Sequence, residues 1–101
     1  MLVIKENVII TGLNSRMQPA IDKCLEIYND VNTDLVITSA HRPWDKKSKH
    51  AKGDAFDIRI RQFTPAEQNE IHAILVNELG TYYDVIIKRN PPHIHIEWEP
   101  K

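Results

Sequence analysis

Apolar residues in two parts of the chain recur at the spacing of an amphipathic helix. A first helix of about four turns is expected after Asn14 or Ser15, either of which is a suitable N-terminal cap. A second helix is predicted to begin at the capping box formed by Thr64 and Glu67 and to end at Gly80. The residues expected to face the core are Ile21, Cys24, Leu25 and Tyr28 in the first helix, and Ile71, Ile74, Leu75 and Leu79 in the second.

Short β-branched or alternating segments predict strands between and around these helices. The predicted strands cover residues 8–10, 35–39, 55–60, 83–87 and 93–98. The last two flank a proline-containing turn and are expected to form a terminal β-hairpin. Because strands and helices are mixed without regular βαβ alternation, we predict one α+β domain over residues 1–101, with helices packed against a small antiparallel-rich sheet.

Two of the predicted strands carry polar side chains on the face that does not point to the core. Alternation places Asp57 and Arg59 on one such face, and His93, His95 and Glu97 on another. The residues predicted to point to the core are Phe56, Ile58, Ile60, Ile94, Ile96 and Trp98. A polar strand face is usually a solvated surface, but two histidines two residues apart are also a common arrangement of metal ligands.

Residues 40–53 are polar and basic and are predicted to form a surface loop that contributes a further ligand. Gly53 allows the chain to turn between His50 in this loop and Asp57 in the following strand. With His95, these side chains can converge on one point. A His/Asp/His set with an open fourth position supplies the neutral nitrogen and anionic oxygen donors that catalytic zinc requires.

The motif Ser-x-His-x-x-Gly-x-Ala-x-Asp at residues 48–57, with His-x-His at 93–95, resembles the zinc D-alanyl-D-alanine carboxypeptidase and L-alanyl-D-glutamate endopeptidase family of peptidoglycan hydrolases. The zinc site of the hedgehog signalling domain is similar. The resemblance covers about residues 35–98, and it implies a hedgehog-like, D,D-peptidase-like catalytic domain that binds one zinc ion. The implied activity is hydrolysis of an amide bond in a peptidoglycan peptide or a D-amino acid dipeptide. The residues it assigns are His50, Asp57 and His95 as zinc ligands, His93 as the catalytic residue, and Arg42 and Ser48 in substrate binding.

The chain departs from this family at the position of the general base. Many members have an acid three residues before the last zinc ligand, where this chain has Pro92. Either His93 takes the proton, or a carboxylate such as Glu97 or Asp84 reaches the site. We favour His93 as the base, and we expect Glu97 to orient a ligating histidine, because such imidazoles usually donate their second nitrogen to a carboxylate or carbonyl.

Three other aromatic residues receive weaker assignments. His41 and Trp44 are candidates for lining the substrate cleft, whereas His72 is expected on the helix surface. Two alternatives to the peptidase stay open: a zinc-bearing binding module without hydrolysis, and a nucleotide hydrolase of the histidine-triad kind. The second would require a third histidine where this chain has Glu97.

Composition narrows the classes of partner. The 13 Lys and Arg residues nearly balance the 14 Asp and Glu residues, so neither nucleic acid nor an anionic membrane is an expected partner. The one cysteine, Cys24, excludes an intramolecular disulfide and a cysteine-rich metal site. The N-terminal segment lacks the apolar core of a secretory signal, so we expect a cytoplasmic protein, or one released to the cell wall as a phage lysin. The sequence does not indicate the oligomeric state.

Overall fold

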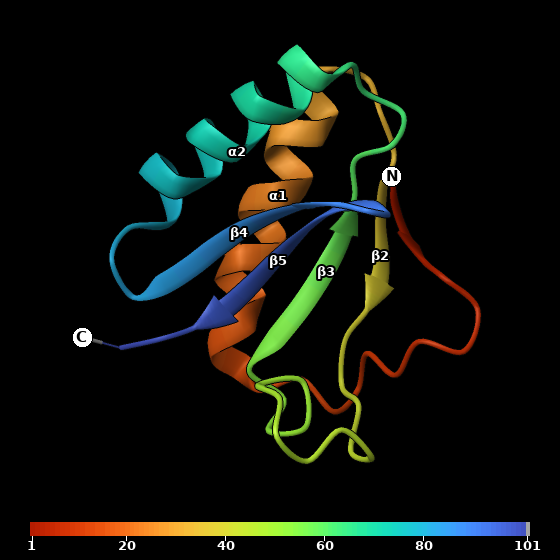
Figure 1. Cartoon of the computed structure of the whole chain (residues 1–101), viewed down its shortest axis with the longest axis vertical. Helices are drawn as coiled ribbons and strands as arrows, with labels where there is room; N and C mark the ends of the chain where they lie inside the picture. The colour runs from red at the N-terminus through yellow and green to blue at the C-terminus, as the bar shows by residue number, and fades with distance from the viewer. Residues whose placement is uncertain (101) are drawn as a thin grey trace.

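A computed structural model describes residues 1–100, which form a five-stranded sheet and two α-helices (Figure 1). The elements in chain order are β1 (Leu2–Ile4), the 3-10 helix η1 (Ser15–Met17), α1 (Gln18–Asp30), β2 (Leu35–Ser39), β3 (Ala55–Arg59), α2 (Pro65–Leu79), β4 (Tyr83–Arg89) and β5 (Pro92–Trp98). The predicted α+β class is confirmed, as are both helices and the four strands from residue 35 onward.

The sheet is mixed, which corrects the prediction of an antiparallel-rich sheet. Its strand order is β1-β2-β3-β5-β4, in which β1 runs parallel to β2 and the remaining neighbours are antiparallel. The parallel pair arises because the chain crosses from β1 to β2 through α1, and such a connection returns the next strand in the same direction.

The first strand was predicted at residues 8–10, and this prediction is wrong. The apolar run Leu2–Ile4 forms β1, whereas residues 8–10 contribute only an isolated bridge between Ile9 and His41. The chain turns after β1, with Asn7 at a φ of 70°, so the second apolar run leaves the edge of the sheet. Both runs are short and β-branched, and pattern alone does not distinguish them.

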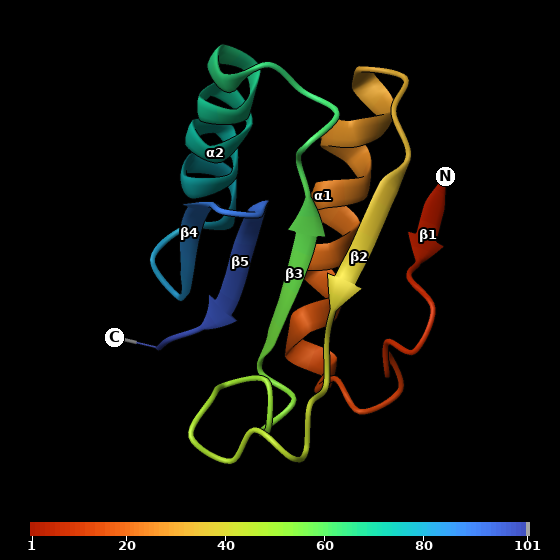
Figure 2. The ribbon, with the colours of Figure 1, turned by 45° about the vertical axis from the view of Figure 1, so that its right-hand side comes forward.

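Both helices cover one face of the sheet (Figures 1 and 2). From the sheet, Phe56, Ile58, Ile94 and Ile96 point into this layer and are completely buried. The helical residues buried against them are Met17, Ala20, Ile21, Cys24, Tyr28, Ile71 and Leu75. Leu25, Leu79 and Trp98 are partly buried at the margin of this core. Neither helix among residues 1–100 has the length and apolar character needed to cross a membrane.

The buried side of α2 differs from the prediction. Ile74 is 39% exposed, whereas Gln68 is buried and its amide donates hydrogen bonds to the backbone oxygens of Ile60 and Phe63. His72, predicted on the helix surface, is half-buried and lies 2.8 Å from the carbonyl oxygen of Val85 in β4. The helix therefore turns its side chains at positions 68, 71, 72 and 75 toward the sheet and leaves Ile74 at the margin.

Candidate metal centre

The pairing of β3 with β5 brings two of the three predicted metal ligands together. Asp57 lies directly opposite His95 in the register, on the face of the sheet away from the helices. His50 reaches them from the loop between β2 and β3. One ligand atom from each of His50, Asp57 and His95 lies within 4.8 Å of the others, and all three residues are buried. This group could hold a metal ion.

The hydrogen bonds of His50 define which of its ring nitrogens is free for a metal. Its Nδ1 lies 2.7 Å from the carbonyl oxygen of Ala40, and a carbonyl only accepts, so Nδ1 carries the proton. In the neutral imidazole, Nε2 then has a lone pair that faces the Asp57 carboxylate at 3.4 Å. A metal ion between these two atoms would satisfy the lone pair and the carboxylate charge together. The donor set therefore fits a metal.

His95 joins two carboxylates. Its Nδ1 lies 2.8 Å from Oδ1 of Asp57, and its Nε2 lies 2.8 Å from Oε1 of Glu97. Burial acts to lower the pKa of His95, but the hydrogen bonds to Asp57 and Glu97 and their negative charges raise it above its ordinary value. A metal bound at Nδ1 would take the place of a proton there. Nε2 would still donate its proton in a hydrogen bond to Glu97, which then orients the ring.

Asp57 is the anionic member of the group. Burial acts to raise the pKa of this carboxyl, whereas hydrogen bonding and positive charge from His50 and His95 lower it, and the balance holds the pKa well below its usual range. Asp57 is therefore ionised at neutral pH and offers a negatively charged oxygen ligand.

The loop that carries His50 is fixed to the rest of the molecule at its end. Asp54 is buried and accepts hydrogen bonds from Nδ2 of Asn14 and from the guanidinium of Arg16, at 2.6 to 2.9 Å. Gly53 has a φ of +76°, and a Cβ atom there would lie 2.3 Å from the backbone oxygen of Gly12. This close contact requires glycine at position 53, and it holds the loop against the segment that precedes α1.

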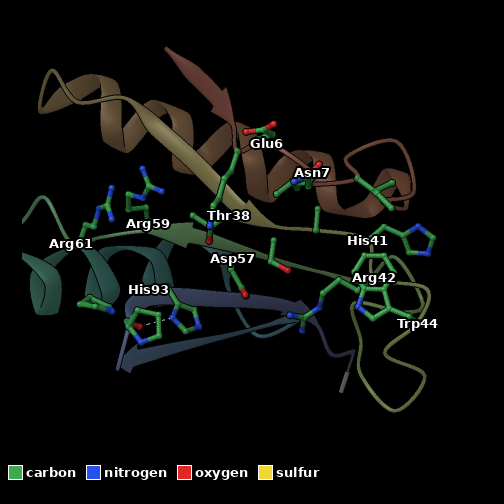
Figure 3. Close-up of a pocket in the computed structure, with 17 residues that line it drawn as sticks. Glu6, Asn7, Thr38, His41, Arg42, Trp44, Asp57, Arg59, Arg61 and His93 are labelled. Carbon is green, nitrogen blue, oxygen red and sulfur yellow. Dashed lines mark hydrogen bonds between the residues drawn. The ribbon is translucent and has the colours of Figure 1, made fainter.

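An open pocket of about 500 Å³ reaches the group at Asp57 (Figure 3). Figure 3 shows Asp57 between His93 on one side and Arg42 with Trp44 on the other. Among residues 1–100, His50 and His95 are not lining residues of this pocket, and they are 1% and 8% exposed. A cavity of this size suits a small molecule or a short peptide segment.

His93 faces this pocket with one nitrogen available. Its Nδ1 lies 2.7 Å from the carbonyl oxygen of Pro91, so Nδ1 holds the proton and Nε2 keeps a lone pair. Within residues 1–100, the other two base candidates, Glu97 and Asp84, do not line the pocket. The geometry thus favours His93 over both carboxylates as a proton acceptor for a molecule in the pocket.

The two residues predicted to bind substrate have different surroundings. Arg42 lines the pocket and pairs with Asp45 at 3.2 Å, and its Nε is buried without a hydrogen-bond partner among the described residues. Ser48 is not a pocket residue in the described part of the chain; its Oγ accepts a hydrogen bond from the backbone N–H of His50. A role for Ser48 in substrate binding stays a prediction, and its contact here helps to position His50.

His41 and Trp44 line the pocket as candidates for the cleft wall. The ring of His41 also fills the space above Gly12, where a Cβ would lie 1.9 Å from it, and its Nε2 lies 3.2 Å from the carbonyl oxygen of Ala51. Trp44 is 66% exposed. His41 is thus fixed by the loop, whereas Trp44 is free to contact a molecule in the pocket.

Arg59 and Arg61 line the same pocket, although neither was predicted to have a functional role. The signal was present, because alternation along β3 places Arg59 on the same face as Asp57, and the same period continues to position 61. In comparisons with known proteins, no family model, curated protein or solved structure matches this chain.

Proposed function

We propose that this protein is a zinc-dependent peptidase that hydrolyses an amide bond in peptidoglycan stem peptides or related D-amino acid peptides. The observation that carries the proposal is the buried group in which His50 Nε2 faces Asp57 Oδ1 at 3.4 Å beside His95, with Asp57 lining an open pocket. The motif at residues 48–57 with His-x-His at 93–95 supports the same activity and a hedgehog-like, D,D-peptidase-like fold.

Zinc is the metal that this donor set suits best. Two imidazole nitrogens and one carboxylate oxygen are typical of catalytic zinc sites, in which three protein ligands leave a fourth position open. The ligands would be Nε2 of His50, a carboxylate oxygen of Asp57 and Nδ1 of His95. When bound, zinc lowers the pKa of coordinated water and polarises a carbonyl group.

The residues around the group would divide the remaining work of amide hydrolysis. His93 would accept a proton at Nε2 and later return it to the leaving amine, as a general base and then acid. Arg42 would bind a carboxylate of the peptide through its guanidinium, exchanging its exposed contact with Asp45 for the substrate. Glu97 would hold the ring of His95 through the hydrogen bond at Nε2.

The first test is the metal content of the purified protein after dialysis against limiting zinc. We expect about one zinc per chain in the wild type and little in His95→Ala. His72→Gln is the matched control, because it removes a histidine outside the group while an amide can still donate to the Val85 oxygen. Equal zinc in the wild type and His95→Ala would place the metal elsewhere, and no zinc in either would overturn the site.

The second test separates binding of zinc from catalysis. We expect His93→Ala to keep zinc and lose about 10² to 10⁴-fold in turnover of muropeptides, the usual contribution of a positioned general base. Product release would be followed by chromatography of the digested peptides. Unchanged turnover in His93→Ala would remove this residue from the mechanism.

A zinc-bearing binding module without hydrolysis is the second candidate. It is favoured by the absence of an acid at Pro92 and by the small number of carboxylates in the pocket, where only Asp57 and Glu6 contribute among residues 1–100. Zinc bound at one ion per chain, with peptide binding but no product, would establish this function in place of the peptidase.

The location of the substrate follows from its chemistry. Peptidoglycan lies outside the cytoplasm, so a wall peptidase of this kind would act after release as a phage lysin. A dipeptidase acting on D-amino acid dipeptides would work inside the cell. Turnover of intact muropeptides favours the first role, and turnover of free dipeptides alone favours the second.

A further inference from the structure

Two guanidinium groups at one side of the pocket have no acidic partner. Arg59 and Arg61 both line the pocket, and within residues 1–100 neither side chain makes a hydrogen bond or ion pair. Arg42, by contrast, pairs with Asp45. Figure 3 shows Arg59 and Arg61 on the His93 side of Asp57, opposite Arg42. The pocket therefore has cations on both sides of the candidate metal group.

The position of Arg59 is set by the core and the sheet. Its backbone oxygen accepts a hydrogen bond of 2.7 Å from the hydroxyl of Tyr28, a residue completely buried under the sheet. In the register, Arg59 lies opposite His93 of β5. Arg59 is half-buried and lines the pocket, whereas Arg61 is exposed.

Arg59 and Arg61 both line the pocket, and an anion bound between two like charges would relieve their repulsion. The other carboxylates that line the pocket do not fill this role, because Asp57 contacts His50 and His95, and no ion pair links Glu6 to either arginine among the described residues. Guanidinium groups bind carboxylates through two parallel hydrogen bonds, which makes arginine suited to such a ligand.

We propose that Arg59 and Arg61 form a second carboxylate subsite, so that the preferred ligand is a peptide with two carboxylates, one bound by Arg42 and one by this pair. The inference rests on the proposed function for the peptide nature of the ligand. It adds a specificity that the metal group does not provide: amidation of the second carboxylate weakens binding.

Binding is measured by NMR titration of the zinc-loaded protein with L-alanyl-D-glutamate and with its two monoamides, which lack either the α- or the γ-carboxylate. We expect each amidation to weaken binding to the wild type by about tenfold or more. In the Arg59→Gln/Arg61→Gln double variant, one of the two amidations no longer changes the affinity, and that amidation identifies the carboxylate bound there. An unaltered response to both amidations would overturn the proposal.

Two further variants separate a specific contact from general charge and from misfolding. Lys88→Gln removes a positive charge from β4 opposite His93, outside the pocket residues, and is expected to keep both amidation effects. Arg61→Gln alone changes an exposed side chain and should lose part of one amidation effect in a normally folded protein.

The same samples report on the proposed function independently, because peptide signals reveal cleavage during the titration. Carboxylate preference lost in the double variant without any cleavage would support the subsite and reject the dipeptidase role, and the muropeptide assay then decides the wall peptidase. Cleavage of the dipeptide with unchanged preference in the double variant would support the peptidase and reject the subsite.

Discussion

Neighbouring residues on β3 and β5 point to opposite faces of the sheet and are buried for different reasons. On the helix face, Phe56 and Ile96 are completely buried among apolar side chains. On the other face, Asp57 and His95 are each only 8% exposed, although both are polar. Burial of apolar surface stabilises a fold, whereas burial of a charge costs free energy unless it is paired. The second face is therefore where a function is expected.

The cover on the two faces also differs. Two helices cover the apolar face, whereas on the other face His50 of the loop contacts Asp57, which also lines an open pocket. His50, Asp57 and His95 each have a charged or carbonyl partner, so the polar face tolerates their burial. We therefore expect changes on the helix face to lower the stability of the fold, and changes on the polar face to weaken binding of the proposed metal.

The largest expected effect is on the helix face. Phe56→Ala should lower the free energy of unfolding by about 3 to 5 kcal/mol, because it removes a fully buried ring and leaves a cavity. Urea unfolding of the metal-free protein measures this change. The folded Phe56→Ala variant should still bind one zinc per chain, since Phe56 points away from the proposed metal ligands.

One outcome of this experiment would contradict the contrast between the two faces. A loss below about 1 kcal/mol would show that Phe56 contributes little to the core. Complete unfolding would leave zinc binding unmeasured in this variant, and the smaller change Ile58→Val, expected to cost about 0.5 to 1.5 kcal/mol at a completely buried position, then carries the zinc measurement.

The next effect is on the polar face and depends on the metal. Zinc at 100 times its dissociation constant should stabilise the wild type by about 2.7 kcal/mol, because it binds the folded chain and not the unfolded one. His50→Gln removes one ligand and should lose most of this stabilisation. Thermal unfolding with and without zinc measures both. Equal stabilisation of the wild type and His50→Gln would show that zinc binds outside the group.

The sequence predicts the two faces more completely than it predicts the site. Alternation alone predicts that Asp57 and Phe56 point to different faces of the sheet, as do His95 and Ile94, because successive side chains of a strand alternate. It does not predict that Asp57 lies directly beside His95, since register depends on the hairpin turn and on the neighbouring strand.

The other features that the sequence did not predict depend on tertiary contacts. The free nitrogen of His50 is defined by a hydrogen bond to Ala40, ten residues earlier in the chain, which no periodicity reveals. Ile74 has the spacing of a core residue but lies at the margin of the helix layer, because α2 packs through Gln68 and Leu75. Alternation places Arg59 on the same face as Asp57, but only the structure shows that it lines the pocket without a hydrogen bond or ion pair of its side chain among residues 1–100.

The smallest expected effect on stability is that of Asp54, which connects the loop bearing His50 to the segment that precedes α1. Asp54→Asn keeps the shape of the side chain but removes the charge that binds Arg16 and Asn14. We expect a loss of about 1 to 2 kcal/mol at pH 7, the range for hydrogen bonds to a charged group with a half-exposed partner. Glu26→Gln, in an exposed pair with Lys23, is the control and should change stability by less than about 0.5 kcal/mol.

The effect of Asp54→Asn should depend on pH in a defined direction. Burial acts to raise the pKa of Asp54, but hydrogen bonds from Arg16 and Asn14 and the charges of Arg16 and Lys49 lower it below its ordinary value of 3.8. A carboxyl whose pKa is lower in the folded state stabilises the fold above 3.8, and this contribution is lost as the pH falls through the folded-state pKa. The difference in unfolding free energy between the wild type and Asp54→Asn should therefore be constant near neutral pH and shrink in acid. A difference that grows as the pH falls would show that Asp54 does not act through its charge.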